Sequence, residues 1–164
     1  MIVTINTDAA WHSDTKIGGY AFWITCDEGR MMQSGVLKRR AGRPEIAEFK
    51  CILNALWVVG VKKLKNVSKI IVNTDCLNVI HLVTGDKKAI KLYKLYWGKY
   101  LVKEYTLLLT KFKIKKSIVK FRHVKSHNGT ETKREYVNDW CDRSAKEEMW
   151  KAVNRKLVVN YMNT

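Results

Sequence analysis

Ile70-Ile71-Val72-Asn73-Thr74-Asp75 decides the fold, because the stretch Val3-Thr4-Ile5-Asn6-Thr7-Asp8 repeats its pattern near the start of the chain. Each stretch is a short run of mostly β-branched residues that ends in Asn-Thr-Asp, which is typical of a buried strand. In an open α/β sheet, ligands and catalytic groups gather at the carboxyl ends of the strands. We therefore expect Asp8 and Asp75 to lie together at one edge of a sheet.

The elements around these two stretches follow from apolar periodicity and turn residues. Strands are predicted at about 2–8, 20–26, 31–37, 69–75 and 118–124, and helices at about 44–60, 77–83, 90–111 and 136–152. The tail, 157–164, fits either a strand or a frayed end. The first three strands form an antiparallel meander, and the strand that follows the first helix must pair in parallel with the first strand. This order predicts an α/β fold in which a five-stranded mixed sheet is flanked by helices.

Length and composition limit the class of protein. The chain has 164 residues, 46% of them hydrophobic, which suffices for one domain spanning 1–164. No apolar run is long enough to span a membrane, and the first residues lack the features of a secretory signal. The four cysteines are far apart and predict neither a disulfide framework nor a zinc site. We expect a cytoplasmic monomer.

The charge of the chain points to a polyanionic partner. The formal net charge is +16, and residues 84–125 hold twelve lysines and one arginine against only Asp86 and Glu104. A solvated lysine-rich face would also explain this excess. A nucleic acid explains it better, because aromatic side chains alternate with the lysines of the basic, largely helical segment at about 84–116. These aromatic residues are Tyr93, Tyr96, Trp97, Tyr100 and Tyr105.

Two further acidic residues are expected near the two aspartates. Glu48 borders the apolar face of the first predicted helix, and Asp142 borders the buried face of the last one. Each acid taken alone has a simpler explanation, since aspartate is common in turns and at helix N-termini. Four carboxylates at one edge of so basic a chain favour a bound cation.

The chemistry of that cation follows from its oxygen ligands. Clustered carboxylates repel one another, and hard divalent cations such as Mg²⁺ or Mn²⁺ relieve the repulsion. Two such ions about 4 Å apart can hold the attacking and leaving oxygens of a phosphodiester displacement. His127, in a predicted loop before the last helix, could relay a proton to the leaving oxygen or assist product release. It could also be an ordinary surface histidine.

Four groups of residues carry a family resemblance. They are Asn6-Thr7-Asp8 with Gly18-Gly19-Tyr20, Ala47-Glu48, Asn73-Thr74-Asp75, and His123-Val124-Lys125-Ser126-His127-Asn128-Gly129 with Asn138-Asp139-Trp140-Cys141-Asp142-Arg143-Ser144-Ala145. Together they resemble the motifs of the ribonuclease H family, type 1, over nearly the whole chain. The resemblance implies the ribonuclease H-like fold.

The resemblance also implies a site and a reaction. By it, Asp8, Glu48, Asp75 and Asp142 would bind two Mg²⁺ ions, with Mn²⁺ as a possible substitute, and His127 would assist turnover. The spacing from Asn138 in the family selects Asp142 rather than Asp139. The implied reaction is endonucleolytic hydrolysis of the RNA strand of an RNA–DNA hybrid, leaving 5′-phosphate and 3′-hydroxyl ends.

Substrate-binding residues are predicted from the same resemblance and from the charge. The segment 87–116 corresponds in position to a basic protrusion that grips substrate in many members. The predicted substrate-binding residues are Arg43, Asn78, Lys87, Lys88, Lys91, Lys94, Trp97, Lys99, Lys125 and Asn138.

Departures from the family pattern leave other functions open. Arg43-Pro44-Glu45-Ile46 stands where bacterial relatives carry paired asparagines that touch the minor groove, and Ala9 stands where many members have glycine. Because contacts to 2′-hydroxyl groups distinguish RNA from DNA, these changes bear on hybrid specificity. A DNA nuclease of the resolvase or transposase type is one alternative. A catalytically inactive nucleic-acid-binding module is another.

Overall fold

The computed structural model describes residues 1–86, 96–124 and 133–162. Their strands are β1 (Ile2–Trp11), β2 (Gly18–Cys26), β3 (Gly29–Val36), β4 (Lys69–Thr74) and β5 (Val119–His123). Their helices are α1 (Pro44–Val61), α2 (Leu77–Thr84), α4 (Tyr96–Lys111) and α5 (Lys133–Met162), with a short 3₁₀ helix, η2 (Lys116–Ile118). No helix within these ranges has both the length and the apolarity needed to cross a bilayer.

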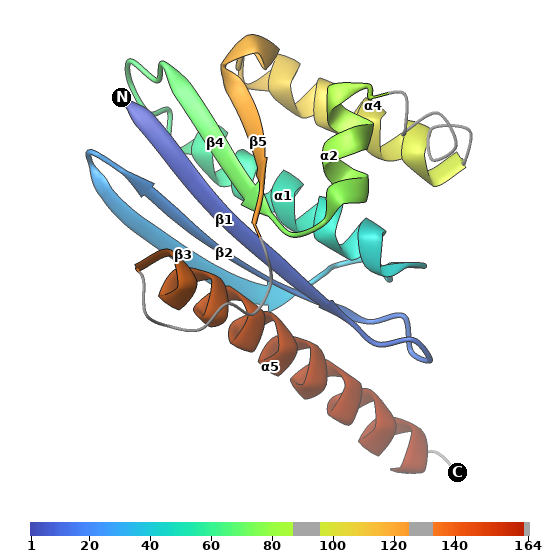
Figure 1. Ribbon diagram of the computed structural model, residues 1–164. Coiled ribbons are helices and arrows are strands. Elements are labelled where there is room, and N and C mark those ends of the chain that lie inside the picture. The colour runs from blue at the N-terminus through green and yellow to red at the C-terminus, as the bar shows by residue number, and fades with distance from the viewer. Residues whose placement is uncertain (87–95, 125–132, 163–164) are drawn as a thin grey trace.

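The strands form one mixed sheet in the order β3-β2-β1-β4-β5. β1 and β3 pair antiparallel with β2, whereas β4 lies parallel to both β1 and β5. Helices α1, α2 and α4 cover one face, and α5 lies across the other (Figure 1). The predicted α/β fold with a five-stranded mixed sheet is therefore confirmed.

The main core lies between the sheet and the helices α1 and α4. Phe49, Ile52 and Leu56 of α1 recur at helical spacing and are fully buried against Val3 and Val72 of the two central strands. Helix α1 begins at Pro44, whose fixed backbone angle suits a first helical turn. This packing fixes the position of α1, which carries Glu48, over the central strands.

A buried polar contact joins the two repeated tripeptides. Asn6 and Asn73 are register partners in the β1–β4 pair, and the Asn73 side-chain amide donates to Asn6 Oδ1 at 2.8 Å. The Thr7 hydroxyl donates to the Asn73 carbonyl at 3.3 Å. Because both asparagines are buried, a shift in register would leave these amides without partners. The repeated tripeptide therefore fixes which residues of the two strands lie side by side.

Two predicted element ends were wrong. The first strand was expected to end at Asp8, but β1 continues to Trp11 because its antiparallel pairing with β2 extends beyond the end of β4. The last helix was expected to end at Ala152, but α5 continues to Met162. No glycine or proline follows Ala152 to stop the helix, and the β-branched residues of the tail do not form a strand.

Helix α5 approaches the sheet closely at Gly19 in β2. A Cβ atom placed there would collide with the Ala145 carbonyl oxygen and with the Met149 amide nitrogen. The absence of a side chain at Gly19 therefore sets the distance between α5 and the sheet. Asp142 lies one turn before Ala145, so its position depends on the same contact.

Gly19→Ala should force α5 away from β2, and we expect a loss of about 1–3 kcal/mol in the free energy of unfolding from overpacking. Gly42→Ala is the matched control, because the nearest atom to its Cβ would be Ile46 Cδ1 at 4.0 Å. Urea unfolding of both variants measures the difference. Equal stabilities would contradict the close approach.

Candidate active site

Three carboxylates from three elements meet at the edge of the sheet where β4 ends. Asp8 comes from β1, Glu48 from the second turn of α1, and Asp75 directly follows β4. One carboxylate oxygen of each lies within 4.8 Å of the others. All three residues are half-buried, so bulk water screens their charges only in part. The structure brings together three of the four predicted metal ligands.

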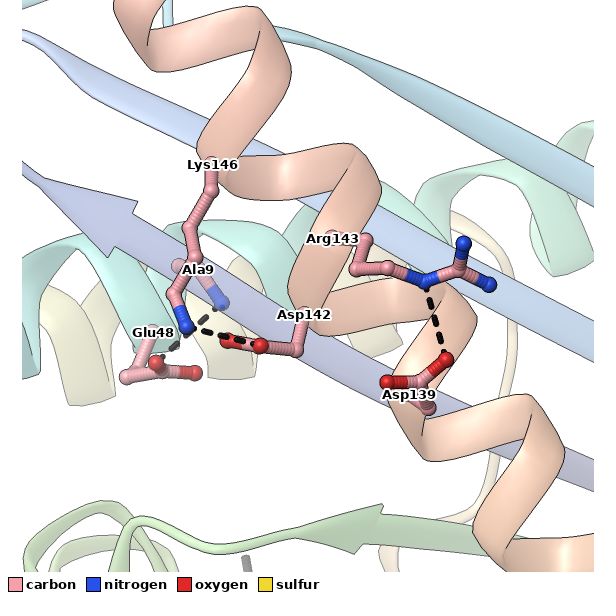
Figure 2. Close-up of polar contacts among 6 residues, drawn as sticks. All are labelled: Ala9, Glu48, Asp139, Asp142, Arg143 and Lys146. Carbon is pink, nitrogen blue, oxygen red and sulfur yellow. Dashed lines mark hydrogen bonds and ion pairs between the residues drawn. The ribbon is translucent and has the colours of Figure 1, made fainter. Parts of the chain in front are cut away.

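One oxygen of Glu48 has a partner and the other does not. Oε1 accepts a hydrogen bond from the Ala9 amide at 3.1 Å (Figure 2). Oε2 is buried and has no hydrogen-bond partner among the described residues. A buried carboxylate oxygen without a donor is costly unless a cation or a proton satisfies it.

The cluster is electrostatically strained. Burial raises the pKa of Asp8 to about 7, and the charges of Asp75 and Asp142 act in the same direction. Burial also raises the pKa of Glu48 well above its ordinary value, with further contributions from Asp8 and Asp75. At neutral pH the cluster therefore takes up protons or requires a cation.

Asp142, the fourth predicted ligand, lies beside this cluster on α5. Its charge acts on Asp8, and its carboxylate accepts from Lys146 Nζ at 2.7 Å. Asp139 instead pairs with Arg143 at 2.8 Å, and its side chain is 38% exposed against 23% for Asp142. In Figure 2, Asp142 and Lys146 lie on the Glu48 side of α5, whereas the Asp139–Arg143 pair lies further from Glu48. Of the two aspartates, Asp142 is the one whose charge acts on Asp8, and its role as the fourth ligand stays a prediction.

The residues of this site fit a hard divalent cation. They offer only oxygen atoms, their net charge is strongly negative, and the unpartnered Glu48 Oε2 lies among them. Carboxylate oxygens are the ligands that Mg²⁺ and Mn²⁺ prefer.

A second polar group joins α1, α2 and α4. Glu45 Oε1 accepts from the Asn78 side-chain amide at 3.4 Å, and Glu45 Oε2 lies 3.7 Å from Arg43 Nε. The Arg43 guanidinium lies 5.8 Å from the centre of the Trp97 ring, whose buried Nε1 has no hydrogen-bond partner among the described residues. Two of the predicted substrate-binding residues, Arg43 and Asn78, thus contact Glu45, one turn before Glu48, and a third, Trp97, lies against Arg43.

The other predicted substrate-binding residues divide into two sets. Lys99 is exposed on α4, and Asn138 is half-buried on α5 one turn before Asp142. Outside the described residues lie His127, Lys87, Lys88, Lys91, Lys94 and Lys125.

The comparisons with known proteins agree with this geometry. The sequence profile of the RNase H family matches residues 1–150. The chain belongs to the RNase H family. Its family assignment makes it a hydrolase of the ribonuclease H type. No curated protein sequence shows significant similarity to the chain.

Several solved RNase H structures share the fold. LC11-RNase H1 from compost, determined with an RNA/DNA hybrid, is 16% identical with a TM-score of 0.67, over 92% of this chain and 99% of that one. An N-terminal RNase H domain from Mycobacterium tuberculosis is 17% identical with a TM-score of 0.69, over 94% and 98%. RNase H1 from Halobacterium salinarum is 16% identical with a TM-score of 0.67, over 92% and 99%. At 16–17% identity, the similarity to these structures shows that this chain has the same fold.

Two residues of this RNase H site were missed by the sequence analysis. Lys146 neutralises Asp142 and lowers the pKa of Asp8, and its position four residues after Asp142 on one helix was a usable signal. Glu45 contacts Arg43, two residues before it, and Asn78, which lies on a different helix, α2. Sequence spacing could not show that contact.

The raised pKa of Asp8 predicts a pH-dependent stability of the metal-free protein. An unfolded chain loses the Asp8 proton near 3.8 and the folded chain near 7, so stability falls as the pH rises through that window. Asp8→Asn removes this loss, and we expect it to stabilise the metal-free protein by about 2 kcal/mol more at pH 8 than at pH 5. Thermal unfolding in chelator at the two pH values measures this difference. The same gain at both would contradict the raised pKa.

Proposed function

We propose that this protein is a metal-dependent endoribonuclease that hydrolyses the RNA strand of RNA–DNA hybrids and leaves 5′-phosphate and 3′-hydroxyl ends. The observation that carries the proposal is the cluster of Asp8, Glu48 and Asp75, with one buried oxygen unpartnered, in a chain of the RNase H family. As proposed, two Mg²⁺ ions are held by these three residues and Asp142, and Mn²⁺ can replace them.

The bound ions would supply an activated water nucleophile and would stabilise charge on the leaving oxygen. The chain's own residues prepare the site for them. The Ala9 amide orients Glu48 so that its other oxygen is free, and Lys146 limits the repulsion between Asp142 and Asp8. We assign to His127 the relay of a proton to the leaving oxygen or assistance in product release, since its position in the sequence lies between β5 and α5, the helix that carries Asp142.

The proposed substrate is a hybrid duplex, as in the LC11-RNase H1 complex. Arg43 and Asn78 lie on the elements next to Glu48 and carry hydrogen-bond donors that can reach 2′-hydroxyl or phosphate oxygens. Trp97 and Lys99 lie in the first turn of α4, and Asn138 adds a donor from α5. The lysines at 87, 88, 91, 94 and 125 are proposed to neutralise phosphates.

Asp142→Asn should lower kcat on a hybrid by at least 10²-fold, because one carboxylate of the proposed metal site is lost. Asp139→Asn is the matched control on the same helix, and we expect its activity within threefold of the parent. Steady-state cleavage of a labelled hybrid measures both. If Asp139→Asn is the inactive variant, the fourth ligand has been assigned to the wrong residue.

A substrate panel separates the hybrid nuclease from its alternatives. Labelled hybrid, duplex RNA, duplex DNA and branched DNA are each incubated with Mg²⁺, Mn²⁺ or chelator. We expect cleavage of the hybrid's RNA strand with either metal and none with chelator. Cleavage of duplex or branched DNA in preference to hybrid would identify a DNA nuclease instead. Tight binding without any cleavage would identify an inactive binding module.

Arg43→Ala should raise KM for the hybrid about tenfold and leave kcat nearly unchanged, because it removes a substrate contact outside the carboxylate cluster. Arg30→Ala is the matched control. Arg30 is also exposed and lies 5.8 Å from the centre of a tryptophan ring, that of Trp23, at the far end of the sheet. Equal KM values for the two variants would remove Arg43 from the substrate site.

A further inference from the structure

A cluster of lysines lies on the two connections that lead into β4 and β5. The segment 62–69 follows α1 and enters β4, and the segment 111–120 runs from the last residue of α4 into β5. Neither segment contains an acidic residue. All of their lysines are exposed, and none has an ion pair within the described part of the chain. We define the rear lysine surface by these residues: Lys62, Lys63, Lys65, Lys69, Lys111, Lys113, Lys115, Lys116 and Lys120.

Aromatic packing brings the two connections together. The Phe112 ring stands edge-on to Trp57 with centroids 5.1 Å apart, and it fills the space beside Gly60, where a Cβ would collide with it. Lys111 Nζ lies 4.1 Å from the centre of the Trp57 ring. Figure 1 shows the last turns of α1 and α4 and the starts of β4 and β5 at one edge of the molecule. The two connections that carry the lysines therefore lie side by side.

This surface is separate from the carboxylate cluster. Strand β4 begins at Lys69 on the rear lysine surface, and Asp75 follows its last residue at the opposite edge of the sheet. Six residues of extended chain span about 20 Å. The basic segment predicted at about 84–116 divides in the structure, because Lys111, Lys113, Lys115 and Lys116 lie at or beyond the end of α4 that is away from Trp97.

The surface is hollowed next to the end of α4. An open hollow of about 410 Å³ lies there, lined by Thr106, Leu109, Thr110, Lys113, Ile114, Lys115 and Lys116. Three exposed lysines beside one hollow give it a positive potential that attracts an anion. The shape and the charge together suit a phosphate backbone.

Two of the lysines occupy backbone conformations that favour glycine. Lys63 has φ 49° just after α1, and Lys113 has φ 55° just after α4. A non-glycine residue in the left-handed region carries a backbone cost. In both connections the chain places a lysine at the position where glycine most often ends a helix.

We propose that the rear lysine surface is a second nucleic-acid-binding surface, which holds the phosphate backbone of a strand other than the one at the carboxylates. An anionic membrane is the less suitable partner, since the surface is hollowed beside the end of α4. This surface does not depend on the catalytic activity proposed above.

The test measures binding of a fluorescein-labelled 40-nucleotide DNA strand by anisotropy, in chelator and over a range of salt. For Lys113→Gln/Lys115→Gln/Lys116→Gln we expect about tenfold weaker binding in 0.1 M salt and a log–log salt slope smaller by about 2. Lys151→Gln/Arg155→Gln/Lys156→Gln removes the same charge from α5 and should change binding less than twofold. Lys62→Gln/Lys63→Gln/Lys65→Gln, on the other connection, should weaken binding as the first variant does.

Cleavage of a short hybrid separates this proposal from the proposed function. A 12-base-pair hybrid should be cut by the first variant at the parent's kcat, whereas Asp8→Asn should bind the DNA strand as the parent does. If the parent cuts no hybrid, the binding comparison still decides the rear lysine surface. Equal DNA binding by both lysine variants and the α5 control would overturn the proposal. The proposal would also be overturned if the lysine variants lost binding to vesicles of phosphatidylserine and phosphatidylcholine but kept binding to the DNA strand. That result would identify a membrane-binding surface.

Discussion

The parallel pairing of β1 with β4 is the contact on which the rest of the site depends. The hydrogen bond from the Asn73 amide to Asn6 Oδ1 lies inside the protein and joins register partners. A slip of one residue would turn every side chain of a strand to the opposite face and leave both amides unpartnered. The register therefore determines that Asp8 and Asp75 extend toward the same place, and α1 and α5 then add Glu48 and Asp142 from opposite faces of the sheet (Figure 1).

The carboxylates at this edge of the sheet, on which the proposed function depends, lower the stability of the folded chain. Burial and mutual repulsion raise the pKa values of Asp8 and Glu48. The metal-free folded chain is therefore less stable at a pH at which these groups are ionised. A cation that binds only the folded state reverses this cost. The charge distribution of the whole chain fits that arrangement, because a protein of net charge +16 keeps a local concentration of acids at one edge and a surface of lysines at the other.

The sequence predicted most of this site, for reasons that lie in local pattern. Asp8 and Asp75 follow β-branched runs, and Glu48 borders a helical apolar face, so each could be placed from its own segment. The choice of Asp142 over Asp139 needed the family resemblance, since both lie on α5 and only contacts with other elements separate them. The Glu45 group and the division of the basic segment could not be predicted, because they depend on how α1, α2 and α4 pack.

Anomalous diffraction from crystals grown with Mn²⁺ near pH 8 tests the central claim most directly, since it locates the metal without relying on activity. The account predicts an anomalous peak bounded by the carboxylates of Asp8, Glu48 and Asp75, with the Glu48 Oε2 atom among its ligands. A second peak toward Asp142 would support the two-ion arrangement. A well-ordered cluster with no peak, or manganese bound only elsewhere, would contradict the assignment of these carboxylates as the metal site.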